Sequence, residues 1–112
     1  MALLQLKIDS TDARVRLALG GELDIASAPE LEAELARVET GGPPPVIVFD
    51  LRDLEFVDSS GLRVLVSADA RAREEGRRVV IVRGPEAVHR IFSVTRLDER
   101  LEIADDLEGL SA

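Results

Sequence analysis

Residues 56–65, Phe-Val-Asp-Ser-Ser-Gly-Leu-Arg-Val-Leu, decide the fold of this chain and hold its most informative polar residues. They follow an apolar, β-branched run at residues 46–49, which is too short to form a helix of its own. They lead into residues 60–75, which have good helix propensity and contain no proline. The order strand, polar turn, helix places two hydroxyls and a carboxylate at a helix N-terminus, where unpaired N–H groups and the helix dipole favour negative charge.

Helix capping explains one serine of this turn but not both. A serine at a helix N-terminus commonly accepts a hydrogen bond from an unpaired backbone N–H. Here Ser59 and Ser60 stand side by side, directly after Asp58. We expect Ser60 to cap the helix, and we expect Ser59, the first hydroxyl after the strand, to be exposed. The second hydroxyl therefore needs another explanation.

The bulk composition describes one globular domain. The chain has 112 residues, enough for one hydrophobic core and too few for two, so we expect a single domain over residues 1–112. Hydrophobic residues make up 46% of it, which predicts a packed fold. The absence of cysteine excludes disulfides, thiolate zinc sites and cysteine nucleophiles. Because the sequence shows neither a signal peptide nor a membrane-spanning apolar run, we expect a soluble, cytoplasmic protein without membrane contact.

The charge of the chain disfavours nucleic acid as a direct ligand. There are 22 acidic and 14 basic residues, which give a net charge of −8. Such a surface repels a phosphate backbone. The three aromatic residues, all phenylalanine, offer no stacking platform for bases.

The first half of the chain predicts a hairpin, a helix and a central strand. Residues 3–8 and 15–19 alternate between apolar and polar side chains and predict a β-hairpin, which we expect Gly20–Gly21 to end. Ser27 and Glu30 have the spacing of a capping box at a helix start. The helix that follows has an apolar stripe of Ala28, Leu31, Leu35 and Val38. A strand apolar on both faces is predicted at residues 46–51.

The second half repeats the alternation of strand and helix. After the helix at residues 60–75, we expect a strand at 79–82, a helix opened by Pro85, a short strand at 101–103 and a closing helical turn at 106–110. The inner face of the Pro85 helix consists of Val88, Ile91 and Phe92. The order ββαβαβαβα predicts an α/β fold with a mixed, mostly parallel β-sheet and helices packed on it.

This topology predicts where polar residues of the two halves meet. Functional residues of open parallel sheets gather at the carboxyl ends of the strands. We therefore expect Asp24 to lie near the turn formed by Asp58, Ser59, Ser60 and Gly61.

The residues of this turn do not favour an enzyme. A serine nucleophile needs a base, and the single histidine, His89, lies on another helix beside apolar Val88, where we expect a surface or boundary position. No Gly-x-Ser-x-Gly motif is present, and the single lysine lies in the first strand, so a phosphate-binding P-loop is excluded. Asp24, Asp58 and Glu55 supply oxygen ligands for magnesium, but carboxylates on loops are more often solvated. We expect no catalytic residue, cofactor or metal on this chain.

The remaining interpretation makes the extra hydroxyl a substrate. Phosphorylating a serine in this turn adds nearly two negative charges beside Asp58. The helix N-terminus can hold the phosphate without unfolding, whereas a partner docked over the turn meets new bulk and like charge. This chemistry describes a switch with one fold in both states.

Three segments of the sequence resemble STAS domains. Residues 21–24, Gly-Glu-Leu-Asp, with the helix start at 27–31, are similar to the family's first signature. Residues 49–51 and 57–62 resemble the second signature in the form found in bacterial anti-sigma factor antagonists. Residues 91–103 are similar to the closing segment, so the resemblance extends from about residue 4 to residue 110.

The resemblance implies a partner-switching protein of bacterial transcription regulation. Such a protein, when unmodified, binds an anti-sigma factor that is itself an ATP-dependent serine kinase, and thereby frees a sigma factor. The kinase binds the ATP and magnesium and phosphorylates the serine after the aspartate, here Ser59; a PP2C-type phosphatase reverses the mark. The implied partner-binding residues are Asp24, Asp58, Ser60, Gly61, Leu62 and Arg63.

Two departures from the family pattern, and one alternative function, remain. Many relatives have glycine where Arg63 stands, so the start of this helix is bulkier and more basic. Many also have glycine where Arg96 stands, and a left-handed cap there is strained for any other residue. The alternative is a STAS-domain structural adaptor in a transport or signalling complex, without a phosphoserine switch.

Overall fold

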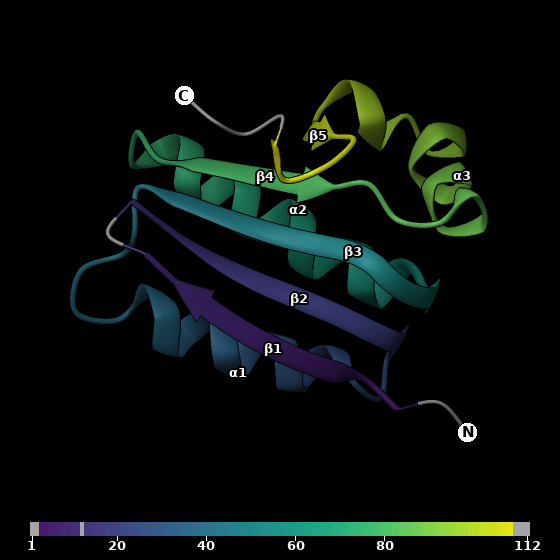
Figure 1. Cartoon of the computed structure of the whole chain (residues 1–112), viewed down its shortest axis with the longest axis horizontal. Helices are drawn as coiled ribbons and strands as arrows, with labels where there is room; N and C mark the ends of the chain where they lie inside the picture. Colours follow the sequence, from purple (N-terminus) through teal and green to yellow (C-terminus); the bar gives the residue numbers. More distant parts are fainter. Residues whose placement is uncertain (1–2, 12, 109–112) are drawn as a thin grey trace.

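The computed structural model describes residues 3–11 and 13–108. In it, the alternating and the continuous apolar segments form the strands of one five-stranded sheet (Figure 1). The elements are β1 (Gln5–Ser10), β2 (Arg14–Leu23), α1 (Ala28–Glu39), β3 (Val46–Val57), α2 (Ser59–Glu74), β4 (Arg78–Val82), α3 (Glu86–Val94), the short 3-10 helix η1 (Leu97–Glu99) and β5 (Glu102–Ala104). The strands lie side by side in sequence order; β1 and β2 are antiparallel and all other neighbours are parallel. The predicted mixed, mostly parallel α/β sheet is confirmed.

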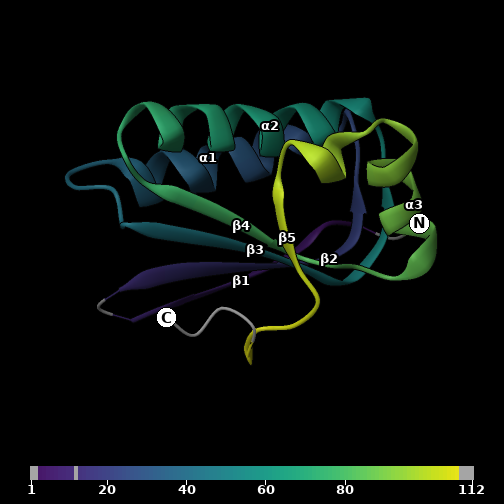
Figure 2. The ribbon, with the colours of Figure 1, turned by 90° about the horizontal axis from the view of Figure 1, so that it is seen from above.

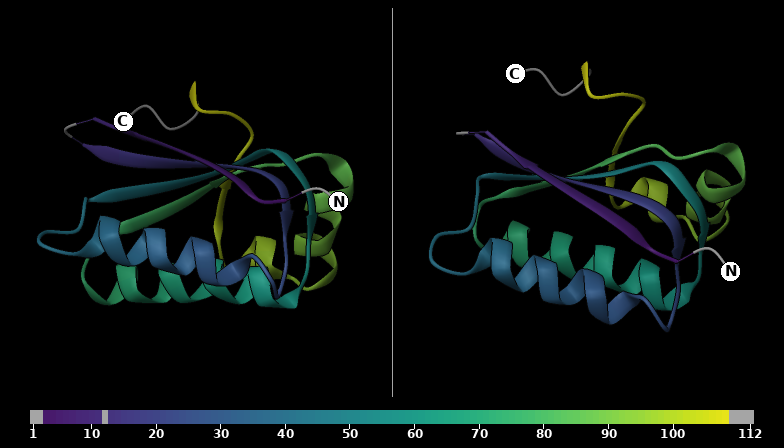
Figure 3. Two further views of the ribbon diagram at one scale, coloured as in Figure 1. Left: turned by 90° about the horizontal axis from the view of Figure 1, so that it is seen from below. Right: turned by 60° about the horizontal axis from the view of Figure 1, so that its bottom comes forward.

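The helices are arranged unequally around this sheet. Helices α1 and α2 lie next to each other on one face (Figures 2 and 3). Helix α3 lies beyond the end of β4 and beside the last part of β3 (Figure 1). The segment after β5 crosses the opposite face, where Leu107 packs against Val48, Val80 and Val82. Among the described residues, no helix combines the length and apolarity needed to cross a bilayer.

The main core lies between the sheet and the helix layer. The apolar stripe of α1 faces inward as predicted, with Ala28, Leu31 and Leu35 buried. Helix α3 buries Val88 and Phe92, two of the three residues predicted for its inner face. The strands contribute buried aliphatic and aromatic side chains to the same core: Leu17, Leu19, Leu23, Ile47, Phe49, Leu51, Leu54, Val57, Val79 and Ile81.

The opposite face of the sheet contains a buried ion network. The Asp50 side chain is 3% exposed and accepts hydrogen bonds from the guanidinium groups of Arg16 and Arg52, at 2.7–3.0 Å. Burial raises the pKa of Asp50, but the hydrogen bonds from Arg52 and Arg16 outweigh it, and the pKa lies below its ordinary value. The network holds β2 to β3 on the face that α1 and α2 leave open.

Two predicted strand ends are wrong. Strand β2 does not end at Gly20–Gly21 but continues to Leu23, with register shifts against β3 on both sides of Gly21. Gly21 has φ +78°, and a Cβ there would lie 2.0 Å from the Leu3 carbonyl oxygen, so glycine forms a bulge rather than a break. Strand β3 likewise continues past Leu51 to Val57, because it pairs with the extension of β2.

The C-terminal part follows the prediction with small shifts. Pro85 occupies the N-cap position of α3, and β5 begins one residue later than expected. Arg96 has φ +62°, which confirms the left-handed conformation that is strained for a non-glycine residue. In the predicted closing turn at residues 106–110, residues 106 and 107 form a bend rather than a helix, and residues 109 and 110 lie outside the described residues.

Candidate functional site

The turns after β2 and β3 lie side by side at the carboxyl edge of the sheet. Leu23 pairs with Val57 in the parallel ladder, and the Asp58 N–H donates to the Leu23 carbonyl oxygen at 3.1 Å. The predicted meeting of the Asp24 loop with the serine turn is therefore confirmed. Two segments far apart in the sequence share one surface.

Asp58 joins these two turns with a single carboxylate. Its Oδ1 accepts hydrogen bonds from Ser60 N–H at 2.9 Å and Gly61 N–H at 3.1 Å, which caps α2. Its Oδ2 accepts from Ile25 N–H in the β2–α1 loop at 3.0 Å. The prediction that Ser60 caps the helix is wrong, because Asp58 has the extended backbone of an N-cap residue and a charged acceptor suited to the helix dipole.

Ser59 stands at the first position of α2 and is exposed, as predicted. Its hydroxyl makes no hydrogen bond with any of the described residues, whereas its neighbours in the turn are tied down. Ser60 is half-buried, and its backbone N–H is held by Asp58. The turn therefore presents one unbonded hydroxyl on a fixed backbone.

Asp24 organises its own loop. Its Oδ1 accepts from the N–H groups of Ala26 and Ser27, both at 3.0 Å, and its backbone N–H donates to Ser27 Oγ at 2.9 Å. Ser27 Oγ also donates to the Glu22 carbonyl oxygen at 2.9 Å. The predicted capping box is wrong, because the Ser27 hydroxyl turns back into the loop and makes no capping bond to α1.

Gly61 and Leu62 are buried beneath this surface. A Cβ on Gly61 would lie 2.6 Å from Leu23 Cγ and 3.0 Å from the Leu23 carbonyl oxygen, so any larger residue pushes α2 away from β2. Leu62 belongs to the hydrophobic core. These two residues set the position of the turn, while the exposed side chains around Ser59 form its outer surface.

Ile25 is a surface residue that sequence reasoning missed. It lies in the β2–α1 loop with 75% of its side chain exposed. Its N–H is the one that Asp58 holds, so the side chain projects from an anchored backbone. An isoleucine between Asp24 and Ala26, outside any strand or helix stripe, was the available sequence signal.

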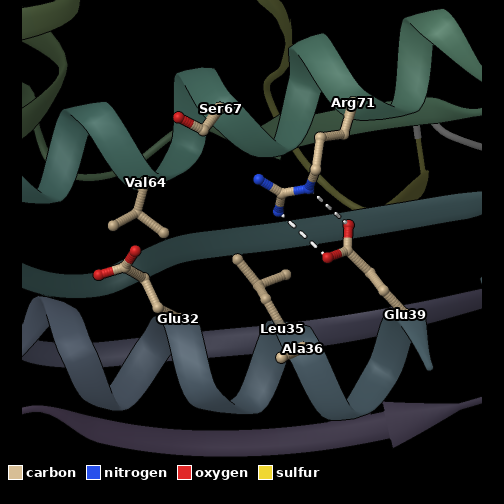
Figure 4. A pocket seen from close by; sticks show the side chains of 7 residues that line it. All are labelled: Glu32, Leu35, Ala36, Glu39, Val64, Ser67 and Arg71. Atoms are coloured by element: carbon tan, nitrogen blue, oxygen red, sulfur yellow. Dashed lines mark hydrogen bonds and ion pairs between the residues drawn. The ribbon is translucent and has the colours of Figure 1, made fainter.

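A shallow groove runs from this surface between α1 and α2. Its first part, of about 320 Å³, is lined by residues of the β2–α1 loop and both helices: Ile25, Ala28, Pro29, Glu32, Ser60, Arg63, Val64 and Ser67. Its second part, of about 200 Å³, shares Glu32, Val64 and Ser67 with the first and reaches the Arg71–Glu39 ion pair (Figure 4). The volumes are at or below the lower end of the range for small-molecule pockets, about 300–1,000 Å³.

No side chain among the described residues makes a hydrogen bond to the Ser59 hydroxyl. The His89 ring stacks on Phe92, with centroids 6.4 Å apart, and its half-buried position agrees with the predicted boundary site. In both Asp24 and Asp58, at least one carboxylate oxygen already accepts hydrogen bonds from backbone N–H groups. No group of three or more acidic, histidine or cysteine side chains arranged to hold a metal occurs within residues 3–11 and 13–108.

The sequence and fold match known proteins along nearly the whole chain. A family model described as "Mlab, STAS domain" matches residues 6–107. The anti-sigma-B factor antagonist of Bacillus subtilis is 29% identical over 106 residues, which cover 95% of this chain and 94% of the relative. The protein of that name from Staphylococcus aureus is 26% identical over 107 residues, covering 94% and 98%. The crystal structure of an anti-sigma factor antagonist from Mycobacterium paratuberculosis has a TM-score of 0.81 at 28% identity, covering 96% of this chain and 90% of that one.

The family match covers far more than half of the sequence. The chain therefore belongs to the STAS domain family, as its two signatures predicted. Its relatives named above are anti-sigma factor antagonists, which are regulatory binding proteins.

Proposed function

We propose that this protein is an anti-sigma factor antagonist whose unmodified form binds an anti-sigma factor and whose binding is ended by phosphorylation of Ser59. The observation that carries the proposal is the exposed Ser59 hydroxyl, which has no hydrogen bond to the described residues and sits on a turn fixed by Asp58. A kinase can reach this hydroxyl without breaking any contact of the fold.

The anti-sigma factor is the serine kinase in this proposal. The γ-phosphoryl group of its ATP passes to Ser59 Oγ, the hydroxyl proton is lost and ADP leaves. A PP2C-type phosphatase hydrolyses the phosphate ester and restores the hydroxyl. ATP and magnesium belong to the kinase, and this chain acts in the cytoplasm as substrate and binding partner.

The binding surface consists of the exposed side chains around Ser59. Ile25 supplies an apolar contact, Arg63 a basic one, and the second oxygen of Asp24 an acidic one. Asp58, Ser60, Gly61 and Leu62 hold these groups in place from the turn and the helix start. An apolar centre with a charged rim is the usual composition of a specific interface.

Phosphorylation changes this surface by charge and bulk. The phosphate brings nearly two negative charges next to Asp58, on a chain that already has a net charge of −8. A partner surface shaped to meet a small neutral hydroxyl then faces a dianion, and like charges brought together in an interface cost several kcal/mol.

The direct test is to incubate the full chain with its cognate anti-sigma factor kinase and ATP, and to map the phosphate by mass spectrometry. We expect one phosphate on Ser59, no incorporation into Ser59→Ala, and full incorporation into the matched variant Ser60→Ala. We also expect the phosphorylated chain to lose its affinity for the kinase. Phosphate on Ser60, or equal affinity before and after modification, contradicts the proposal.

A structural adaptor without a switch is the second candidate. It is favoured by the matching family model, whose description names Mlab rather than an anti-sigma factor antagonist. An adaptor does not need an exposed serine at position 59. Binding of a partner that is insensitive to both Ser59→Ala and Ser59→Asp supports the adaptor.

A further inference from the structure

Ser59 and Arg63 are one helical turn apart on α2, and both are exposed. Side chains four residues apart lie on the same face of a helix, and each Cα–Cβ bond is tilted toward the N-terminus. The Arg63 side chain therefore extends back over the turn that carries Ser59 and Ser60. Its position beside Ser60 in the groove agrees with this direction.

Arg63 has no carboxylate partner, in contrast to the other arginines of α2. Arg71 pairs with Glu39 at 3.1 Å and Arg73 with Asp69 at 2.8 Å. Among the described residues, no carboxylate oxygen lies within ion-pair distance of Arg63, although Glu32 lines the same groove. Within the first turn of α2 no side chain is acidic, and the N-cap carboxylate of Asp58 already accepts backbone N–H groups with both of its oxygens. This helix start therefore has a guanidinium without a carboxylate partner.

We propose that Arg63 binds the phosphate of phosphorylated Ser59 within the same helix, so that the mark adds charge at position 59 and also withdraws Arg63 from the partner. The proposal rests on the proposed function, because it concerns the modified state of the same serine. An acidic group four residues before a basic one is the favourable orientation for a helical ion pair. Phosphate attracts a guanidinium more strongly than a carboxylate does because it carries nearly two negative charges, and it can accept two charge-assisted hydrogen bonds from the planar group.

Several charged groups compete with this pair or act on the same phosphate. Asp58 lies in the turn itself, Asp24 in the β2–α1 loop and Glu32 on α1 across the groove. The Oδ1 atoms of Asp58 and Asp24 already accept backbone N–H groups. Glu32 offers Arg63 another carboxylate across the groove, and Asp24 keeps a second oxygen, but each of these carboxylates carries a single charge against nearly two on the phosphate.

The test uses the full chain with phosphoserine introduced at position 59 during translation, so that no kinase is needed. Phosphorus NMR follows the second ionisation of the phosphate from about pH 4.5 to 8. In the parent chain, which has Arg63, we expect the midpoint of the phosphate titration to lie about 0.5 pH units lower than in Arg63→Gln. A nearby cation favours the dianion even at an exposed site. Arg63→Lys restores part of the shift, and the matched variant Glu32→Gln, which leaves Arg63 in place, keeps a low midpoint.

Equal midpoints for the parent chain and Arg63→Gln overturn the proposal. A midpoint that is lower in Arg63→Gln than in the parent chain also overturns it, because removing a cation cannot favour the dianion. Thermal melts of each variant establish that the chain is folded across the titration. The outcome is independent of the kinase experiment: failure to label Ser59 contradicts the proposed function, whereas equal midpoints contradict only the role of Arg63.

Discussion

Each of the two loops at the carboxyl edge holds an aspartate followed by a serine, but the two serine hydroxyls differ in their bonding. In the β2–α1 loop, Asp24 is followed by Ser27, and the Ser27 hydroxyl is hydrogen-bonded to Asp24 and Glu22. In the β3–α2 turn, Asp58 is followed by Ser59, whose hydroxyl has no such bond in the described structure. The first hydroxyl holds the loop together, and the second has no bond to lose if it is modified as we propose. The two serines therefore differ in their hydrogen bonds and not in their residue type.

Charge at position 59 gives the largest expected effect in binding. We expect Ser59→Asp to weaken affinity for the anti-sigma factor by at least about 30-fold, roughly 2 kcal/mol, because a carboxylate enters an interface that fits a hydroxyl. Ser59→Ala keeps the affinity of the parent chain. Isothermal titration with parallel melts measures both. Equal affinities of folded Ser59→Asp and Ser59→Ala would contradict the proposed effect of charge at position 59.

Removal of the Asp58 carboxylate gives the largest expected loss of stability. Asp58→Ala loses the helix cap and the bond to Ile25, and we expect its free energy of unfolding to fall by about 2 kcal/mol. Asp58→Asn keeps a capping oxygen, but its amide nitrogen cannot accept a hydrogen bond from Ile25 N–H. We therefore expect its free energy of unfolding to fall by about 1 kcal/mol or less. Urea unfolding of the two variants separates the cap from the link between the loops. A loss as large for asparagine as for alanine contradicts the assignment of the two oxygens.

Ile25 tests whether the first loop contributes to binding as well as to folding. Ile25→Ala removes an apolar side chain that is 75% exposed, so we expect a normal melting temperature and about a tenfold loss of affinity, roughly 1.4 kcal/mol. Ile8→Ala on β1, where the side chain is 42% exposed, is the matched control and keeps its affinity. If both variants bind like the parent chain, the apolar contact lies elsewhere.

The smallest effect separates the two serines by stability alone. Ser27→Ala leaves the Asp24 N–H and the Glu22 carbonyl without their partner, and we expect a loss of about 1 kcal/mol. Ser59→Ala removes no bond, and its stability stays within about 0.5 kcal/mol of the parent chain. Thermal or urea unfolding decides between them. A destabilising Ser59→Ala shows that this hydroxyl has a structural role.

Local patterns predicted the sheet, the three helices and the meeting of the two loops, because periodicity and strand order depend on neighbouring residues. They did not distinguish a bulge from a break at Gly20–Gly21, since a bulge exists only against a partner strand. Nor did they select Asp58 over Ser60 as the cap, because both are good caps and the choice depends on backbone angles. The pairing of Asp50 with Arg16, far apart in sequence, likewise needs the register of the sheet.

The ion network of Asp50 affects how the fold responds to acid. Burial raises the pKa of Asp50, but hydrogen bonds from Arg52 and Arg16 outweigh this effect, so in the folded chain the pKa lies below its ordinary value. A lowered carboxyl pKa stabilises the fold above the pKa of the unfolded chain, and this contribution is lost only as pH falls through the folded value. A phosphoserine changes charge near about pH 6. A phosphate placed on Ser59, as we propose, therefore changes its charge at a higher pH than the one at which this network, on the far face of the sheet, loses its contribution to stability.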